Sequence, residues 1–335
     1  MAGSSKPRKL TSYPLQRQLK KGGLPRSGAK KVTLQKWPLL WQYPNSLKTQ
    51  GIELKIPLYC TKPPTISTYA HYIGTGTYKY QYIMANIKLY GYSTSPYVRK
   101  VACCLYYKKL PFEFIPVKPT NSKEIAFTKQ TQVPVLKIGD EWHTDSTPLA
   151  IWLDELYPEN PLFGNNQEQR ERILALDSWV TENPILAMFR TAHEAKMTAK
   201  FRHTAWRLSA IVSSQSPLSD EVRAAWPDLL KTAPFIHHMM NCVDTSESLS
   251  QMHARIATEL VSHLKEGPFL GGFEQPSLAD FALYPQLVFG YMVGIEQHLL
   301  AAMEPSLNKW LQNMKPHLPK NPLLVPDFMI VNDLP

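Results

Sequence analysis

The fold is decided by residues 87–105, IKLYGYSTSPYVRKVACCL, whose pattern predicts a strand that leads into a helix. The side chains of residues 87–92 alternate between apolar and more polar, and many are of the kinds that favour strands. After the polar turn 93–96, apolar side chains recur at the i, i+3, i+4, i+7 spacing of a helix packed on one side. They are Val98, Val101, Ala102 and Leu105. The segment therefore predicts a strand joined to a packed helix by a tight turn.

The residues that follow extend this pattern into a complete α/β half over 84–163. We expect a strand at 112–117, a short helix at 121–129 and a strand at 134–138. The dipeptide Gly139-Asp140 predicts a two-residue hairpin turn into a strand at 141–144, and a helix then opens near Asp145. The resulting order, βαβαββα, is that of a thioredoxin-like domain.

The turn before the first helix carries the first candidate site. Proline is favoured at the first helical position, so Pro96 places Ser95 where an N-cap belongs. The Ser95 hydroxyl and the free N–H groups of the helix start would face an anion bound there. An ordinary serine cap remains the alternative. Cys103 and Cys104 lie two turns along this helix, where we expect them to be packed.

Two further segments have features of a ligand site. Pro134 stands at the start of a strand. Because proline has no backbone N–H, it cannot donate a hydrogen bond in the ladder of a central strand. A cis Val133–Pro134 bond would turn the Val133 main chain toward a ligand, whereas a trans bond fits an edge strand. Asp145 and Ser146 stand directly before a helix and could hold the ammonium and carboxylate of an amino acid, or could simply cap that helix.

The three segments together, with their order and spacing, resemble the glutathione transferase superfamily. The similarity is greatest to its bacterial Ser-type members, which carry a Ser-Pro-Phe/Tyr-Val-Arg-Lys segment, here residues 95–100. The resemblance covers nearly all of 84–325. It implies an α/β thioredoxin-like N-terminal domain plus an all-α C-terminal domain, the glutathione-transferase fold.

The resemblance also implies roles for particular residues. The Ser95 hydroxyl would hydrogen-bond the glutathione sulfur and favour the thiolate. Pro134 would be cis, Val133 would pair with the cysteinyl part of glutathione, and Asp145 with Ser146 would bind its γ-glutamyl end. We expect Gln132 to lie in the same glutathione-binding segment, although family members often have Gly-Lys where this chain has Thr131-Gln132.

From residue 168 to 325, strand signals vanish and helical periodicity takes over. Ser277 with Asp280 three residues later predicts a capping box, with Asp in place of the usual Glu or Gln. The family carries this Ser-Leu-Ala-Asp element on a buried helix, and its role is in folding. Residues 200–245 exceed the family pattern and predict an extra helix or two beside a hydrophobic substrate pocket. Their histidines match no metal-ligand spacing, so we expect no metal.

Charge divides the chain into two parts. The whole chain has a net charge of +10, but residues 1–83 hold 14 Lys and Arg residues against one acid, a net charge of +13. The other 252 residues therefore carry −3, so any affinity for nucleic acid would reside in the first 83 residues alone. These contain eight prolines and no sustained hydrophobic period, which predicts a disordered basic extension.

The role of this extension is open between four alternatives. It could bind nucleic acid, direct the protein to an organelle, tether it to an anionic membrane, or be an upstream extension of the reading frame that begins before Met84. A targeting segment is disfavoured because prolines interrupt every candidate helix and few arginines are present. We expect either an upstream extension of the reading frame or a disordered leader without function, so that residues 1–83 are dispensable.

The composition is that of a soluble globular protein, and nothing at the start of the chain resembles a secretory signal with an apolar centre. Apolar residues make up 44% and charged residues 19%. No apolar run reaches the roughly 18 residues of a membrane span, and the four cysteines fit reduced thiols better than a disulfide framework. We therefore expect a cytoplasmic protein. The resemblance to glutathione transferases further implies a homodimeric detoxification transferase that uses glutathione and a small hydrophobic electrophile. A glutathione-transferase-like binding or interaction module without turnover is the alternative.

Overall fold

The computed structural model describes residues 46–49, 52–55, 68–73, 77–82, 86–299 and 304–334. In its α/β half, a four-stranded mixed sheet has the strand order β6-β5-β7-β8. Strand β5 pairs with β6 in parallel and with β7 antiparallel, and β7 pairs with β8 antiparallel. The elements are β5 (Ile87–Gly91), α2 (Pro96–Tyr107), β6 (Glu113–Pro116), η1 (Lys123–Thr128), β7 (Val135–Ile138), β8 (Glu141–Thr144) and α3 (Ser146–Leu156). The thioredoxin-like element order predicted from the sequence is confirmed.

One expected helix differs in type. Residues 123–128 form the 3-10 helix η1, whose Ile125 has non-helical backbone angles, instead of an α-helix over 121–129. Left-handed residues flank it, Ser122 with φ 46° and Lys129 with φ 57°. A segment this short can form few helical hydrogen bonds, which is the usual setting for 3-10 geometry.

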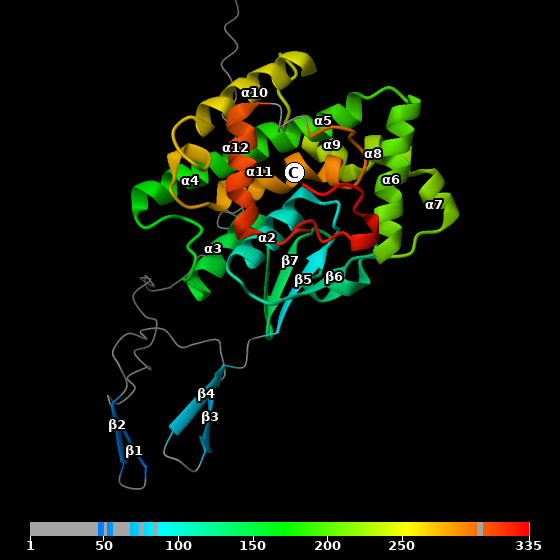
Figure 1. The fold of residues 1–335 in the computed structure, drawn as a ribbon. Helices are drawn as coiled ribbons and strands as arrows, with labels where there is room; N and C mark the ends of the chain where they lie inside the picture. The colour runs from blue at the N-terminus through cyan, green and yellow to red at the C-terminus, as the bar shows by residue number, and fades with distance from the viewer. Residues whose placement is uncertain are drawn as a thin grey trace, which may run out of the picture. The chain divides into compact units, whose positions relative to one another are not determined.

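Helix α2 lies between the sheet and helix α11 (Leu278–Met292) (Figure 1). Gly91 allows β5 to approach α2 closely, because a Cβ atom at this position would lie 2.4 Å from Cγ2 of Val98. The predicted apolar stripe is fully buried, and so are Cys103 and Cys104. The expectation that α2 packs on one side is wrong: Arg99 and Lys100, between Val98 and Val101, are each 1% exposed because helices cover the second face.

The region after residue 166 is helical, as predicted. Its longer elements are α4 (Gln167–Val180), the π-helical turn η2 (Thr181–Ile185), α5 (Leu186–Glu194), α6 (Ala199–Gln215), α10 (Leu249–Leu264), α11 and α12 (Pro305–Met314). The shorter ones are α7 (Asp220–Ala224), α8 (Trp226–Thr232), α9 (Pro234–Met240), η3 (Leu270–Gly272), η5 (Lys315–His317) and η6 (Asp327–Met329). Helices α6 to α9 occupy the region where one or two extra helices were expected.

The two halves share one hydrophobic core. Leu89 of β5, Leu105 of α2 and Phe281 of α11 belong to the same cluster of buried side chains. The predicted capping pair lies within it: Asp280 is fully buried and its Oδ2 accepts hydrogen bonds from the N–H (2.8 Å) and hydroxyl (2.9 Å) of Ser277. Its Oδ1 accepts from the N–H of Leu270 and the indole of Trp310, so this side chain joins three segments.

In the N-terminal segment, the described residues form two separate antiparallel strand pairs. Strand β1 (Ser46–Thr49) pairs with β2 (Ile52–Lys55), and β3 (Thr68–Ile73) pairs with β4 (Thr77–Tyr82). These pairs were not expected from the sequence. The rest of the predicted extension 1–83 lies outside the described residues, so its disorder stays a prediction.

Candidate active site

The sheet register brings the three predicted segments to one end of the sheet. Tyr90 of β5 lies opposite Val135 of β7, and Val135 lies opposite Thr144 of β8. The chain continues from the Tyr90 end into the turn that carries Ser95, from the Thr144 end into Asp145, and enters Val135 from Pro134. Segments separated by up to fifty residues in the sequence therefore meet at the same end of the sheet, which is the arrangement that a shared site requires.

Ser95 occupies the predicted N-cap position of α2, but its hydroxyl does not cap the helix. Its backbone is extended (φ −78°, ψ 126°), its N–H donates to the Tyr92 carbonyl at 2.9 Å, and its carbonyl accepts from the Arg99 N–H at 3.2 Å. The side chain is partly exposed and makes no capping hydrogen bond. The main chain is thus fixed, while the hydroxyl remains available to a ligand at the positive end of the helix.

Ser93, two residues earlier in the same turn, is in a different environment. It is 1% exposed, and its hydroxyl donates to Oε1 of Gln215 at 2.6 Å. A buried hydroxyl that is already bonded is poorly placed to meet a ligand from solvent. Of the two serines, Ser95 is the one whose partly exposed hydroxyl a ligand could reach.

The Val133–Pro134 peptide bond is cis, which settles the alternative left open by the sequence. Pro134 is buried and Val133 is half-buried, and both directly precede Val135, the first residue of β7. Gln132 is exposed, and both of its main-chain polar groups are bonded to the side chain of Gln130. The cis bond thus lies where the Val133 main chain can face the site.

Asp145 directly precedes α3 in a conformation that side chains rarely adopt, with φ 72° and ψ 125°. Such strain in a non-glycine residue is often found at functional sites. Partial burial raises the pKa of its carboxyl above the ordinary value, and the charge of Lys100 and the N–H groups of Ser146 and Thr147 oppose that rise. Ser146 is 4% exposed at the first position of α3, so the acid and the hydroxyl lie together at a helix start.

A buried ion pair that the sequence reading missed holds the two site helices together. Nζ of Lys100 contacts the carboxylate of Asp177 at 2.6 and 2.8 Å and the hydroxyl of Thr147 at 2.8 Å. The Thr147 hydroxyl donates in turn to Asp177 at 2.7 Å. Because Lys100, Thr147 and Asp177 belong to α2, α3 and α4, this network fixes Asp145 relative to Ser95. The signal in the sequence was a lysine beside an apolar stripe, which more often marks a solvated helix face.

Arg99 is a second buried cation that the sequence reading missed. Its guanidinium lies 4.1 Å from the ring centre of Phe289, and it donates to the Ser93 carbonyl and to Gln286. Burial lowers the pKa of Arg99 to about 9. The group therefore remains charged at neutral pH.

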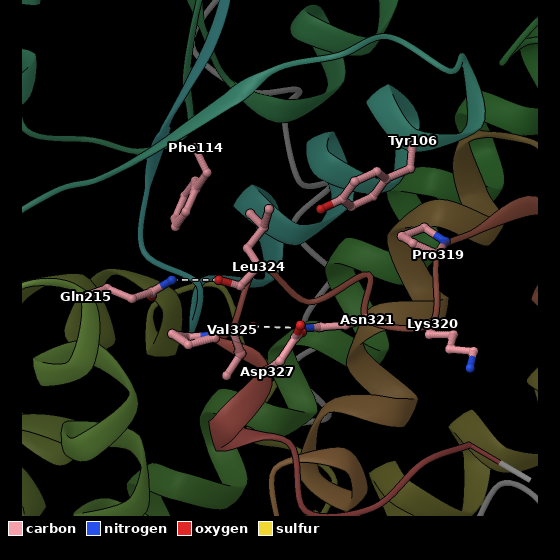
Figure 2. A pocket seen from close by; sticks show the side chains of 10 residues that line it. Tyr106, Phe114, Gln215, Pro319, Lys320, Asn321, Leu324, Val325 and Asp327 are labelled. Carbon is pink, nitrogen blue, oxygen red and sulfur yellow. Dashed lines mark hydrogen bonds between the residues drawn. The ribbon is translucent and has the colours of Figure 1, made fainter.

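An open hollow of about 570 Å³ lies close to the turn but apart from the predicted residues (Figure 2). Tyr106 and Phe114 line one side and the chain segment 319–327 the other. Gln215 lines it too: its Nε2 donates to the Leu324 carbonyl at 2.6 Å, while its Oε1 accepts from Ser93. Burial raises the pKa of Tyr106 to about 12, so its phenol stays neutral. None of the residues predicted to bind glutathione lines this hollow.

Within the described ranges, no group of three or more His, Cys, Asp or Glu side chains could hold a metal ion. In the same part of the chain, no helix combines the length and apolar character needed to cross a membrane.

This fold and site define a thioredoxin-like domain joined to a helical region, and comparisons with known proteins indicate its relatives. Residues 89–161 match the model of the family described as "Glutathione S-transferase, N-terminal domain". That range includes every predicted site residue from Ser95 to Ser146.

Two curated relatives come from Arabidopsis thaliana. Glutathione S-transferase Z2 is 29% identical over 151 residues, which is 42% of this chain and 67% of that protein. Glutathione S-transferase Z1 is 29% identical over 141 residues, 39% of this chain and 63% of that protein, so less than two thirds of its length is matched.

Among solved structures, a glutathione transferase homologue from Sulfitobacter with bound glutathione has a TM-score of 0.44 and 15% identity, and covers 69% of this chain and 93% of that one. The family match and the two curated relatives support the glutathione transferase superfamily that the sequence motifs predicted.

Proposed function

We propose that this chain is a glutathione-dependent transferase of the Ser type, in which the Ser95 hydroxyl stabilises the glutathione thiolate. One observation carries the proposal: Ser95, the cis Val133–Pro134 bond and the Asp145-Ser146 pair meet at one end of the sheet, and the Ser95 hydroxyl is not used by the helix it precedes. The names of the Arabidopsis relatives are consistent with this chemistry.

In this proposal each part of glutathione has its own partner. The γ-glutamyl ammonium lies against the Asp145 carboxylate, and the γ-glutamyl carboxylate lies at the Ser146 hydroxyl and the start of α3. The cysteinyl main chain pairs with Val133, beside Gln132 and Pro134. These contacts place the sulfur at the Ser95 hydroxyl.

The chemical step is attack of sulfur on an electrophilic carbon. The thiol first loses its proton to solvent, and Ser95 donates a hydrogen bond to the resulting thiolate. The sulfur lone pair then forms a carbon–sulfur bond, while a leaving group departs with its electron pair or an activated double bond takes up a proton. Lowering the thiol pKa by one unit needs about 1.4 kcal/mol, which is within reach of one hydrogen bond to a charged group.

A binding module without turnover is the second candidate. It is favoured by the segment before the cis bond, where Thr131-Gln132 replaces the Gly-Lys common in the family. The lost lysine would weaken contact with the glycyl carboxylate, and the Gln130 side chain already occupies the polar main-chain groups of Gln132. Such a protein would keep the fold and bind glutathione weakly.

Two measurements on the full chain separate these candidates. Retention on immobilised glutathione tests binding, and conjugation of glutathione to a chlorinated nitroarene tests turnover. Retention with turnover supports the transferase, and retention without turnover across several electrophiles supports the binding module. Failure of both would refute glutathione as the ligand.

The remaining features of the proposal concern context. We infer a cytoplasmic homodimer that conjugates small hydrophobic electrophiles in detoxification, without nucleic-acid binding by the folded part. Twofold pairing is the commonest assembly of soluble proteins. Residues 168–325 supply the substrate pocket in this proposal.

A further inference from the structure

Arg99 is a buried cation without an acidic partner. It is 1% exposed, and among the described residues no ion pair includes it. Buried charges normally need a counter-ion or a full set of hydrogen bonds. Here Nη1 donates to the Ser93 carbonyl at 2.9 Å, Nη2 donates to Oε1 of Gln286 at 2.6 Å, and the Phe289 ring lies below the guanidinium. Every partner of this charge is neutral.

Gln286 of α11 completes the arrangement with its other amide atom. Its Nε2 donates to the carbonyl of Pro96 at 3.1 Å and to that of Ala282, one turn earlier in α11, at 3.0 Å. Arg99 and Gln286 thus hold the carbonyls of Ser93 and Pro96, which flank Ser95 on both sides. On the outer side of the turn, Gln215 of α6 holds the Ser93 hydroxyl.

We propose that Arg99 and Gln286 are positioning residues that hold the Ser95 turn in its reactive geometry and leave a positive charge beside it. This inference rests on the proposed function, since the turn matters only if Ser95 meets a thiolate. The residues act through the main chain of the turn and do not contact glutathione themselves.

A glutamine, and not a glutamate, at position 286 is what this role requires. The amide both accepts from Arg99 and donates to the Pro96 carbonyl, which a carboxylate cannot do. A carboxylate would also neutralise Arg99 and so remove a positive potential that favours an anion at the start of α2. The titratable group acting on Arg99 is the Cys103 thiol, and burial raises its pKa well above the ordinary value, so it stays neutral.

The test compares Gln286→Glu, Gln286→Met and Arg99→Lys with wild type in the full chain. Lys108→Met is the matched control. Lys108 is also a buried cation, but it lies at the C-terminal end of α2, away from Ser95, where it bonds Asp154 and the Tyr157 carbonyl. For each protein, steady-state kinetics give kcat and the KM for glutathione. The ultraviolet absorbance of the bound thiolate against pH gives the pKa of its sulfur, and hydrogen exchange reports the opening of residues 92–99.

We expect Gln286→Glu to raise the pKa of the bound thiol by about one pH unit and to lower kcat at neutral pH about tenfold. The KM for glutathione should change by less than about threefold, because no glutathione contact is lost. Gln286→Met should also speed hydrogen exchange in the turn. Arg99→Lys keeps the positive charge, so the pKa of the bound thiol should stay close to the wild-type value. Lys108→Met should lower the thermal midpoint but leave the thiol pKa unchanged.

In a protein that binds glutathione, either of two results overturns the inference. One is a wild-type thiol pKa and kcat in a folded Gln286→Glu protein, and the other is an equal rise of the thiol pKa in Lys108→Met. If wild type neither binds glutathione nor forms a thiolate, the proposed function fails. Hydrogen exchange still tests whether Gln286 holds the Ser95 turn, and unchanged exchange of residues 92–99 in Gln286→Met refutes that role. Active wild type with unaffected variants refutes the positioning role alone.

Discussion

Replacement of Ser95 by alanine is the most direct test of the proposed site, because we expect it to leave folding almost unchanged and to reduce the rate of the chemical step strongly. Loss of a serine cap usually costs about 0.5–2 kcal/mol. The Ser95 hydroxyl makes no capping bond, so that cost does not arise here. We expect a free energy of unfolding within about 0.5 kcal/mol of wild type, as for other partly exposed positions without a structural role.

The effect on chemistry follows from the lost hydrogen bond. A hydrogen bond to a charged group contributes about 1.5–3 kcal/mol, and 1.36 kcal/mol corresponds to one pH unit, so the pKa of the bound thiol should rise by about one to two pH units. Below both pKa values the thiolate fraction, and with it kcat, falls by about 10- to 100-fold. Above both pKa values the thiol is ionised in either protein, and the rates should converge.

The assay is the pH dependence of kcat for Ser95→Ala, measured together with its thermal midpoint. Ser93→Ala is the comparison, because its hydroxyl lies in the same turn but is buried against Gln215. That variant should lose stability and keep the wild-type pH profile. An unchanged profile in Ser95→Ala, or a shifted one in Ser93→Ala alone, would refute the assignment of Ser95.

Asp145→Asn should weaken glutathione binding about tenfold at neutral pH, with a smaller effect on kcat. We expect wild type to lose affinity as pH falls through the Asp145 pKa, which lies above its ordinary value, and the variant to lack this pH dependence; titration calorimetry against pH checks both. Asp280→Ala should lower the free energy of unfolding by about 3–5 kcal/mol in urea, because it leaves more than one buried donor unpaired, among them the Trp310 indole and the Leu270 N–H, each at a cost of about 1–3 kcal/mol. Asn166→Ala at the exposed start of α4 should cost about 1 kcal/mol. Sedimentation at micromolar concentration should show a homodimer, and a monomer alone would contradict it. A chain that begins at Met84 should keep the thermal midpoint and specific activity of the full chain, since a segment that buries little apolar area adds little stability.

The local features of the α/β half could be predicted from the sequence because they depend on neighbouring residues. Alternation from Ile87, the apolar period after Pro96 and the Gly139-Asp140 turn give the order of strands and helices. The same short-range patterns pointed to Ser95, Val133-Pro134 and Asp145-Ser146 as candidate site residues, since proline and capping residues mark the ends of elements. The 3-10 form of η1 was not predictable, because so short a segment has no period of its own.

The tertiary structure decided what those local patterns leave open. Ser93 and Ser95 are equivalent as sequence, and only Gln215, 122 residues away, engages one hydroxyl and leaves the other available. Arg99 and Lys100 read as solvated charges on a helix packed on one side. They are buried because α4 and α11 cover that face and supply Asp177 and Gln286, the latter 187 residues from Arg99. The period of a helix shows which residues share a face, but partners distant in sequence decide whether that face meets water or protein.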